Sequence, residues 1–195
     1  MTHSSFAASF VDDLLGLYAS LGARTYGEGV SQIEHALQSA HHARVDGASP
    51  SLVAACLLHD VGHMVQKLGE DAADRGRDDH HEMIGAGVLG RGFGPDVVEP
   101  VRLHVQAKRY LAAFEPGYLE LLSPASLKSL RLQGWLMTAE EAETFLAHPA
   151  AENAILLRRY DERGKVQSVE LDGLDTYRDM LCALVDQHQA SSGAA

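Results

Sequence analysis

The stretch Leu57-Leu58-His59-Asp60-Val61-Gly62-His63 places metal-ligating side chains in the most apolar part of the chain. It ends an uninterrupted apolar run that begins at Leu52 and predicts a helix buried on all sides. Burying a histidine beside a carboxylate costs free energy unless both side chains find partners. Adjacent helix positions point about 100° apart, so His59 and Asp60 can share a metal only at the helix surface between them. Other helices must therefore supply the remaining ligands.

Amphipathic spacing, capping residues and glycine or proline stops predict helices along the whole chain. The predicted helices cover residues 6–21, 31–45, 52–68, 79–89, 95–115, 127–132, 138–148, 150–160 and 177–189. Residues 166–171 alone have a strand-like pattern, and they are too few to build a sheet. Because no repeat or linker divides the chain, we predict an all-α fold of antiparallel helices in a single compact domain over residues 1–195.

Charge and composition narrow the possible partners. The chain has 16 Lys and Arg against 27 Asp and Glu, a formal net charge of -11. This balance repels nucleic acid and anionic lipid at long range, so we expect neither as a partner. With two cysteines, no apolar run near the roughly 20 residues of a membrane span and no secretory leader, we expect a cytoplasmic protein. These features leave the oligomeric state open.

Eleven histidines are an unusual number for this length, and several stand on separate predicted helices. The candidate metal ligands are His35, His59, Asp60, His81, His104 and Asp161. Six protein donors exceed what a catalytic single-metal site normally takes, because such a site keeps positions open. Two metals that share a carboxylate fit better, and donors without thiolate suit iron, manganese or zinc. His80 is an alternative to His81, which we favour because it directly precedes the Glu82-Met83-Ile84-Gly85 run.

The order of these donors is similar to that of a known superfamily. His35, the His59-Asp60 pair and the distal Asp161 resemble the signature of the HD-domain superfamily, over roughly residues 30–165. Its members are mostly metal-dependent phosphohydrolases on a helical fold. The resemblance implies an HD-type domain with a motif-bearing core at about 25–165 and a C-terminal helix at about 175–189. His81 and His104 resemble the additional histidines of its binuclear branch.

Three longer segments resemble a narrower family, the mixed-valent di-iron oxygenases of organophosphonate breakdown. They are Gly27-Glu28-Gly29-Val30-Ser31-Gln32-Ile33-Glu34-His35-Ala36-Leu37-Gln38, His104-Val105-Gln106-Ala107-Lys108-Arg109-Tyr110-Leu111 and Leu122-Ser123-Pro124-Ala125-Ser126-Leu127. This family contains the PhnZ-type 2-amino-1-hydroxyethylphosphonate dioxygenases and their trimethylammonio-substrate relatives. The resemblance runs nearly from end to end of the chain.

The narrower resemblance implies two iron ions in an Fe(II)/Fe(III) active state. One iron would be held by His35, His59, Asp60 and Asp161, and Asp60 would bridge to a second held by His81 and His104. The implied reaction uses O₂ to split the carbon–phosphorus bond of a 1-hydroxy-2-(substituted amino)ethylphosphonate. It releases phosphate and glycine or an N-methylated glycine, with His59 and Asp60 at the catalytic centre.

Further polar residues fit an anionic substrate. Lys108 follows His104 by one helical turn and Arg158 precedes Asp161 by three residues, so both can face an anion at the metals. Arginine supplies a planar fork for a phosphonate and lysine a point charge. The expected contacts of the phosphonate are His63, Lys108, Ser126 and Arg158. Their ordinary alternatives are solvated charges for the two cations and a helix cap for Ser126.

The loop before residue 31 contains the residue that we expect to bind the substrate's amine. Glu28 resembles the family residue that receives the amino group, and its charge suits a primary or a methylated amine equally. The family has a tyrosine three positions before this glutamate, where it ligates the second iron until substrate displaces it. This chain has Thr25 there and Tyr26 one position later, so Tyr26 is the candidate gating ligand.

Three other functions are compatible with parts of the pattern. An HD-type phosphohydrolase would use the same metals to activate a water that attacks a small phosphate ester. An inositol-oxygenase-like reaction would also use two irons on a related fold. A metal-free binding or signalling module is a third alternative, which the presence of all six candidate ligands disfavours.

Overall fold

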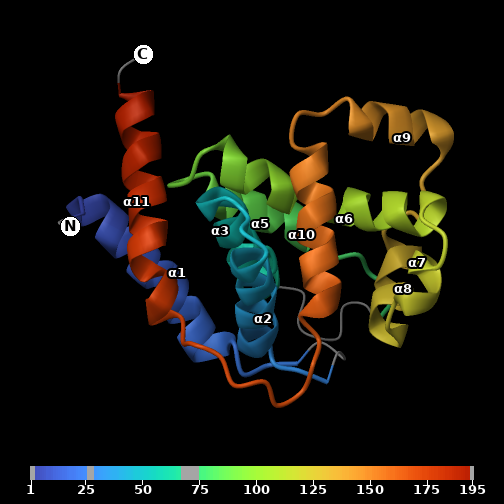
Figure 1. Ribbon diagram of the computed structural model, residues 1–195, viewed down its shortest axis with the longest axis horizontal. Helices are drawn as coiled ribbons and strands as arrows, with labels where there is room; N and C mark the ends of the chain where they lie inside the picture. Colours follow the sequence, from blue (N-terminus) through green and yellow to red (C-terminus); the bar gives the residue numbers. More distant parts are fainter. Residues whose placement is uncertain (1–2, 26–28, 67–74, 194–195) are drawn as a thin grey trace.

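A computed structural model describes residues 3–25, 29–66 and 75–193 of the chain. All regular secondary structure in these ranges is helical, which confirms the all-α prediction (Figure 1). The helices are α1 (Ser5–Leu21), α2 (Gln32–Val45), α3 (Pro50–Leu58), α4 (Val61–Val65), α5 (His81–Leu89), α6 (Pro95–Phe114), α7 (Tyr118–Leu121), α8 (Pro124–Leu132), α9 (Ala139–Leu146), α10 (Ala151–Arg163) and α11 (Asp175–Ser192).

Local capping sets where several of these helices begin. Ser31 caps α2 and Thr138 caps α9, each in a reciprocal capping box with the glutamate three residues later. Ser49 and Ser123 cap α3 and α8, in both cases directly before a proline at the first helical position. The starts of α2 and α9 agree with the prediction, because the donor and acceptor of each cap lie within one turn of each other. α3 and α8 begin at their prolines, two and three residues earlier than predicted.

The single helix expected over residues 52–68 is wrong in one respect: it breaks at the His59-Asp60 pair. α3 ends at Leu58, Asp60 has φ -95° and ψ 8°, and α4 starts at Val61. The break brings α4 against α5, where Gly62 lies so close that an added Cβ would stand 1.9 Å from the carbonyl oxygen of His81. The turn therefore places His59 and Asp60 where α3, α4 and α5 meet.

The structure also differs from the sequence expectations after residue 160. α10 continues to Arg163, so Asp161 lies in its last turn and not beyond its end. The segment 166–171 forms no strand. The side chain of Gln38 instead binds the main chain of Val166 twice, donating from Nε2 to its oxygen at 2.8 Å and accepting from its nitrogen at 3.1 Å. These two hydrogen bonds from a side chain hold the segment in place of the main-chain hydrogen bonds that a strand would make.

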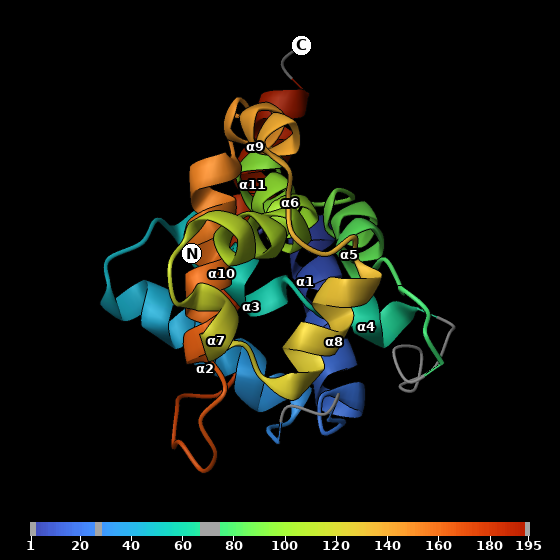
Figure 2. The same cartoon turned by 90° about the vertical axis from the view of Figure 1, so that its right-hand side faces the viewer.

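α3 lies in the middle of the bundle, which explains its apolar composition. It packs against α2 and α6, while α10 packs across both of these helices. Figure 2 shows α3 among α2, α5, α6 and α10. α1 and α11 pair at one side, and α7, α8 and α9 lie at the other (Figure 1). In the described part of the chain, no helix combines the length and apolar composition needed to cross a bilayer.

Candidate metal centre

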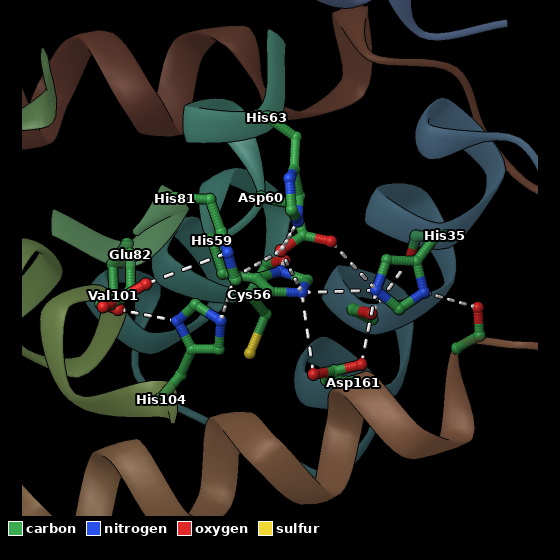
Figure 3. Close-up of polar contacts among 12 residues, drawn as sticks. His35, Cys56, His59, Asp60, His63, His81, Glu82, Val101, His104 and Asp161 are labelled. Atoms are coloured by element: carbon green, nitrogen blue, oxygen red, sulfur yellow. Dashed lines mark hydrogen bonds and ion pairs between the residues drawn. The ribbon is translucent and has the colours of Figure 1, made fainter. Parts of the chain in front are cut away.

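All six candidate ligands come together at the carboxyl end of α3 (Figure 3). They are His35 of α2, His59 and Asp60 between α3 and α4, His81 of α5, His104 of α6 and Asp161 of α10. Five of them are buried, and the side chain of Asp60 is 15% exposed. Residues that are far apart in the sequence thus form one polar cluster inside an apolar bundle.

Three of these residues form the part that we call the α2–α10 half: His35, His59 and Asp161. Nε2 of His35 lies 3.2 Å from Nε2 of His59 and 3.4 Å from Oδ1 of Asp161. Nε2 of His59 lies 3.9 Å from Oδ2 of Asp161. One ligand atom from each residue lies within 4.8 Å of the others, a spacing that suits a single metal ion.

The two remaining histidine ligands, His81 and His104, form together with His63 of α4 the part that we call the α5–α6 half. Nε2 of His81 lies 3.0 Å from Nε2 of His104. The ring of His63 stacks on that of His81, with centroids 3.9 Å apart and an angle of 17° between the planes. A second set of ligand atoms within 4.8 Å of one another comes from Asp60, His63 and His81. His63, expected to contact substrate, is therefore as close to Asp60 as a ligand would be.

Asp60 lies between the two halves. Its Oδ2 is 3.7 Å from Nε2 of His35, while its Oδ1 is 3.5 Å from Nε2 of His59 and 3.8 Å from Nε2 of His81. One carboxylate thus lies within 4 Å of histidines of both halves: Oδ2 faces His35, and Oδ1 lies between His59 and His81. This is the arrangement that a carboxylate shared by two metals requires.

The outer nitrogens of the histidines show which nitrogen can bind a metal. Nδ1 of His35 lies 2.9 Å from the carbonyl oxygen of Gly164, and Nδ1 of His59 lies 2.9 Å from that of Cys56. Nδ1 of His104 lies 2.7 Å from the carbonyl oxygen of Val101. A carbonyl only accepts hydrogen bonds, so Nδ1 carries the hydrogen and Nε2 keeps its lone pair. Two Nε2 atoms at 3.0 to 3.2 Å repel each other unless a proton or a metal ion lies between them. The donor set therefore fits metal ions, supported in the manner usual for metal-bound histidine.

The charges of the cluster keep its carboxylates ionised. Burial alone would raise the pKa of Asp60, but the neighbouring His59, His63 and His81 outweigh it and hold that pKa far below its usual range. Burial likewise opposes ionisation of Asp161, yet Arg158 and Lys165 lower its pKa well below the ordinary value. The site thus offers carboxylates in the form that metal binding requires.

Burial has the opposite effect on His59 and His104, the two least exposed histidines of the cluster. It lowers the pKa of His59, and it lowers that of His104 still further with help from the adjacent imidazoles. Both rings therefore stay neutral near pH 7 and can act as nitrogen donors.

The expected anion-binding residues are buried beside the cluster. Lys108, Ser126 and Arg158 have little exposed surface. Lys108 Nζ donates to Ser129 Oγ at 2.9 Å, and burial together with the charge of Arg158 lowers the pKa of Lys108 to about 7. Arg158 donates from Nε to the hydroxyl of Tyr118 at 2.8 Å and also contacts Asp161. Neither cation is a solvated surface charge.

Three residues at the site were missed by the sequence analysis. Lys165 Nζ donates to Ser126 Oγ at 2.9 Å and lies 3.8 Å from Oδ1 of Asp161. Its position four residues after Asp161 is the same signal that identified Lys108. Asp79 binds two histidines, and its spacing two residues before His81 was a weak signal. Tyr118 could not have been found, because nothing near it in the sequence points to Arg158.

The remaining expectations concern the second histidine and the loop before α2. His80 has 68% of its side chain exposed and lies beside Asp78, so His81 is the one of this pair that faces the cluster. Tyr26 and Glu28 lie outside the described residues. Their expected contacts with the metal and the amine stay predictions.

Comparisons with known proteins identify relatives of this chain. A family model named HD domain matches residues 33–133. The chain is 41% identical over 168 residues to the hydroxymethylphosphonate dioxygenase of Gimesia maris, covering 86% of this chain and 84% of that protein. It is 37% identical over 184 residues to the glycine-betaine-forming 1-hydroxy-2-(trimethylamino)ethylphosphonate dioxygenase of Leisingera caerulea, covering 94% of each. An uncharacterized protein of Acanthamoeba polyphaga mimivirus is 33% identical over 175 residues, which is 88% of this chain and 80% of that protein. These matches confirm the family resemblance drawn from the sequence.

Proposed function

This chain belongs to the HD-domain family, in the branch of the phosphonate dioxygenases, and from this premise we propose its reaction. It is an oxygenase that uses O₂ to cleave the carbon–phosphorus bond of a 1-hydroxy-2-(substituted amino)ethylphosphonate. The products are phosphate and glycine or an N-methylated glycine. The observation that carries the proposal is the position of Asp60, whose carboxylate lies within 4 Å of histidines from both halves of one buried histidine–aspartate cluster.

We assign two iron ions to this cluster. The first is held by His35, His59, Asp60 and Asp161, and the second by Asp60, His81 and His104. The Nε2 atoms that face each other at 3.0 to 3.2 Å within each half support this assignment. Burial raises the pKa of the nearby Cys56, so that residue keeps its thiol and leaves a nitrogen and oxygen donor set, which suits iron. Bound iron supplies the O₂ chemistry, and the protein supplies positions and charge.

The substrate's phosphonate is held by Lys108, Arg158, Ser126 and His63. Cations that are buried together repel one another, and a dianion placed among them removes that cost. Asp161 already accepts part of the charge of Arg158, so the phosphonate is the main counter-charge of Lys108. Lys165 joins this group through its hydrogen bond to Ser126.

The group on the second carbon of the substrate is assigned from the sequence. Glu28 offers the negative charge that an ammonium or trimethylammonium group requires. Hydroxymethylphosphonate, which the Gimesia maris relative is named for, is a second candidate substrate, and it has no amine for Glu28 to meet. The cytoplasmic location expected from the sequence also stays part of this proposal.

The test is an assay of phosphate release by anaerobically purified, iron-loaded protein. Hydroxymethylphosphonate, 1-hydroxy-2-aminoethylphosphonate and its trimethylammonio analogue are incubated under air and under argon, with phosphate esters in parallel. Phosphate should appear from a hydroxyphosphonate only under air. Phosphate release from an ester under argon would instead identify the phosphohydrolase. No release from any hydroxyphosphonate in air by a protein that holds two irons would overturn the proposal.

A substitution at Glu28 separates the candidate substrates. Glu28→Gln should raise the KM for the amine-bearing substrates roughly tenfold, because a charge-assisted contact is lost. The KM for hydroxymethylphosphonate should stay unchanged. An equal effect on all three substrates would contradict the assignment of Glu28 to the amine.

A further inference from the structure

One carboxylate at this site holds two imidazoles. Oδ2 of Asp79 lies 2.6 Å from Nδ1 of His63, and its Oδ1 lies 2.9 Å from Nδ1 of His81. Oδ1 also accepts from the main-chain nitrogen of His81 at 3.3 Å. The side chain of Asp79 is only 12% exposed. Asp79 therefore connects the main chain at the start of α5 with two rings of the α5–α6 half.

The contact sets the direction of both rings. Each oxygen of Asp79 lies within hydrogen-bond distance of one ring nitrogen. An ionised carboxylate only accepts, so each ring turns an Nδ1–H toward it. The Nε2 atoms of the two rings then lie 3.9 and 3.8 Å from Oδ1 of Asp60. The stacking of the rings follows from this shared partner.

We propose that Asp79 is a positioning residue that holds His81 toward the second metal and His63 toward the bound substrate. The inference rests on the two-iron site proposed above. Among the four candidate histidine ligands, His35, His59 and His104 have main-chain carbonyls beside Nδ1, and His81 has this side chain. The orientation of His81 can therefore be removed by one substitution. Because the same substitution releases His63, metal binding and substrate binding should weaken together.

The neighbouring residues offer a matched control. Asp78 stands two residues before His80 just as Asp79 stands two before His81. Its Oδ1 accepts from the main-chain nitrogen of His80 at 3.3 Å, and its Oδ2 lies 3.3 Å from Nδ1 of that ring. Asp78 thus contacts the main chain and the ring of the residue two positions later, as Asp79 does, but the imidazole of His80 is mostly exposed. Removing Asp78 changes the local turn without changing the site.

The experiment compares Asp79→Ala, Asp79→Asn and Asp78→Ala with the unmodified chain. Each protein is titrated anaerobically with Fe(II) against a chelator, and iron per chain, KM and the thermal unfolding midpoint are measured. Asp79→Ala should weaken binding of the second iron about 10- to 100-fold and leave the first unchanged. The KM for the hydroxyphosphonate should rise. The iron affinity and KM of Asp79→Asn should lie between those of Asp79→Ala and the unmodified chain, because its one amide oxygen can accept from only one of the two imidazoles. Asp78→Ala should match the unmodified chain.

Two results would overturn the proposal. One is an Asp79→Ala protein that binds two irons with unchanged affinity and unchanged KM. The other is an equal loss in Asp78→Ala, which would show an effect of the turn alone. If Asp79→Ala fails to fold, Asp79→Asn carries the same test. The iron titration needs no turnover, so a failure of the proposed reaction is recognised separately by the absence of phosphate release.

Discussion

The two halves of the metal centre are supported in different ways. In the α2–α10 half, main-chain carbonyls orient both imidazoles, and the cations Arg158 and Lys165 keep Asp161 ionised. In the α5–α6 half, a carbonyl orients His104, while the side chain of Asp79 orients His81 and His63. The imidazoles of the α2–α10 half are thus oriented by the main chain, and two of the three in the α5–α6 half are oriented by a side chain.

This difference predicts how firmly each of the two proposed metal ions would be held. The carbonyl of Cys56 belongs to the buried helix α3 and that of Gly164 to the cap of α10, so moving either one disturbs a helix. Asp79 precedes α5 and can rotate about its own side-chain bonds without unfolding a helix. We therefore expect the first iron to be bound more tightly than the second.

The largest effect should come from removing the residue that joins the halves. Asp60→Ala should cost both irons and reduce phosphate release to background, because the carboxylate faces both groups of histidines. Iron analysis and the phosphate assay measure this directly. Asp46→Ala is the control, since Asp46 is an exposed aspartate paired with Arg163. Retention of two irons with turnover in Asp60→Ala would refute the bridging role.

A smaller effect should separate the two halves. His104→Ala should lose the second iron and keep the first, because it removes one donor from the α5–α6 half alone. Chelator treatment of the unmodified protein should release iron in the same order. Iron per chain and electron paramagnetic resonance follow both experiments. Simultaneous release of the two irons would contradict the expected difference in support.

The smallest effect should come from the anion-binding lysine, which touches neither half. Lys108→Met should keep both irons and raise the KM for the phosphonate by about tenfold near pH 6, through loss of a charged contact. Metal content that falls with this substitution would place Lys108 in the metal site instead.

The same lysine predicts a pH dependence with a definite sign. Its pKa of about 7 reflects burial and the nearby Arg158 and Lys165, opposed by Asp161 and Asp60. The protonated form binds the anion, so phosphonate affinity contributed by Lys108 is present below pH 7 and lost as the pH rises above it. Ionisation of the phosphonate itself changes the KM of the unmodified protein and of Lys108→Met by the same factor. The difference between the two KM profiles should therefore shrink with rising pH, and a constant difference would contradict it.

Much of the fold could be predicted because its signals are local. Ser31 and Thr138 cap their helices through residues only three positions away. The break at Asp60 could not be predicted, because it depends on the fit of Gly62 against the carbonyl of His81 on another helix. The apolar run continues through this point and masks the change of direction.

The candidate site divides in the same way. The residue types and their order point to six donors, since a histidine–aspartate pair in an apolar helix needs partners wherever it lies. The hydrogen bonds that the histidines make through Nδ1 cannot be predicted from the order of residues. Nδ1 of His35 faces the carbonyl of Gly164, 129 positions along the chain. Lys165 lies at the site because α10 extends to Arg163 and the side chain of Gln38 binds the main chain of Val166.

Most helix positions, the six candidate donors and the family could thus be predicted from the sequence, because each depends on neighbouring residues or on residue type. The folded molecule was needed to show which oxygen of Asp60 faces which histidine, which of His80 and His81 points inward, and that Asp79 holds two rings at once. These are relations between atoms a few ångströms apart on segments that only packing brings together. They depend on the angles at which helices meet, which no local pattern encodes.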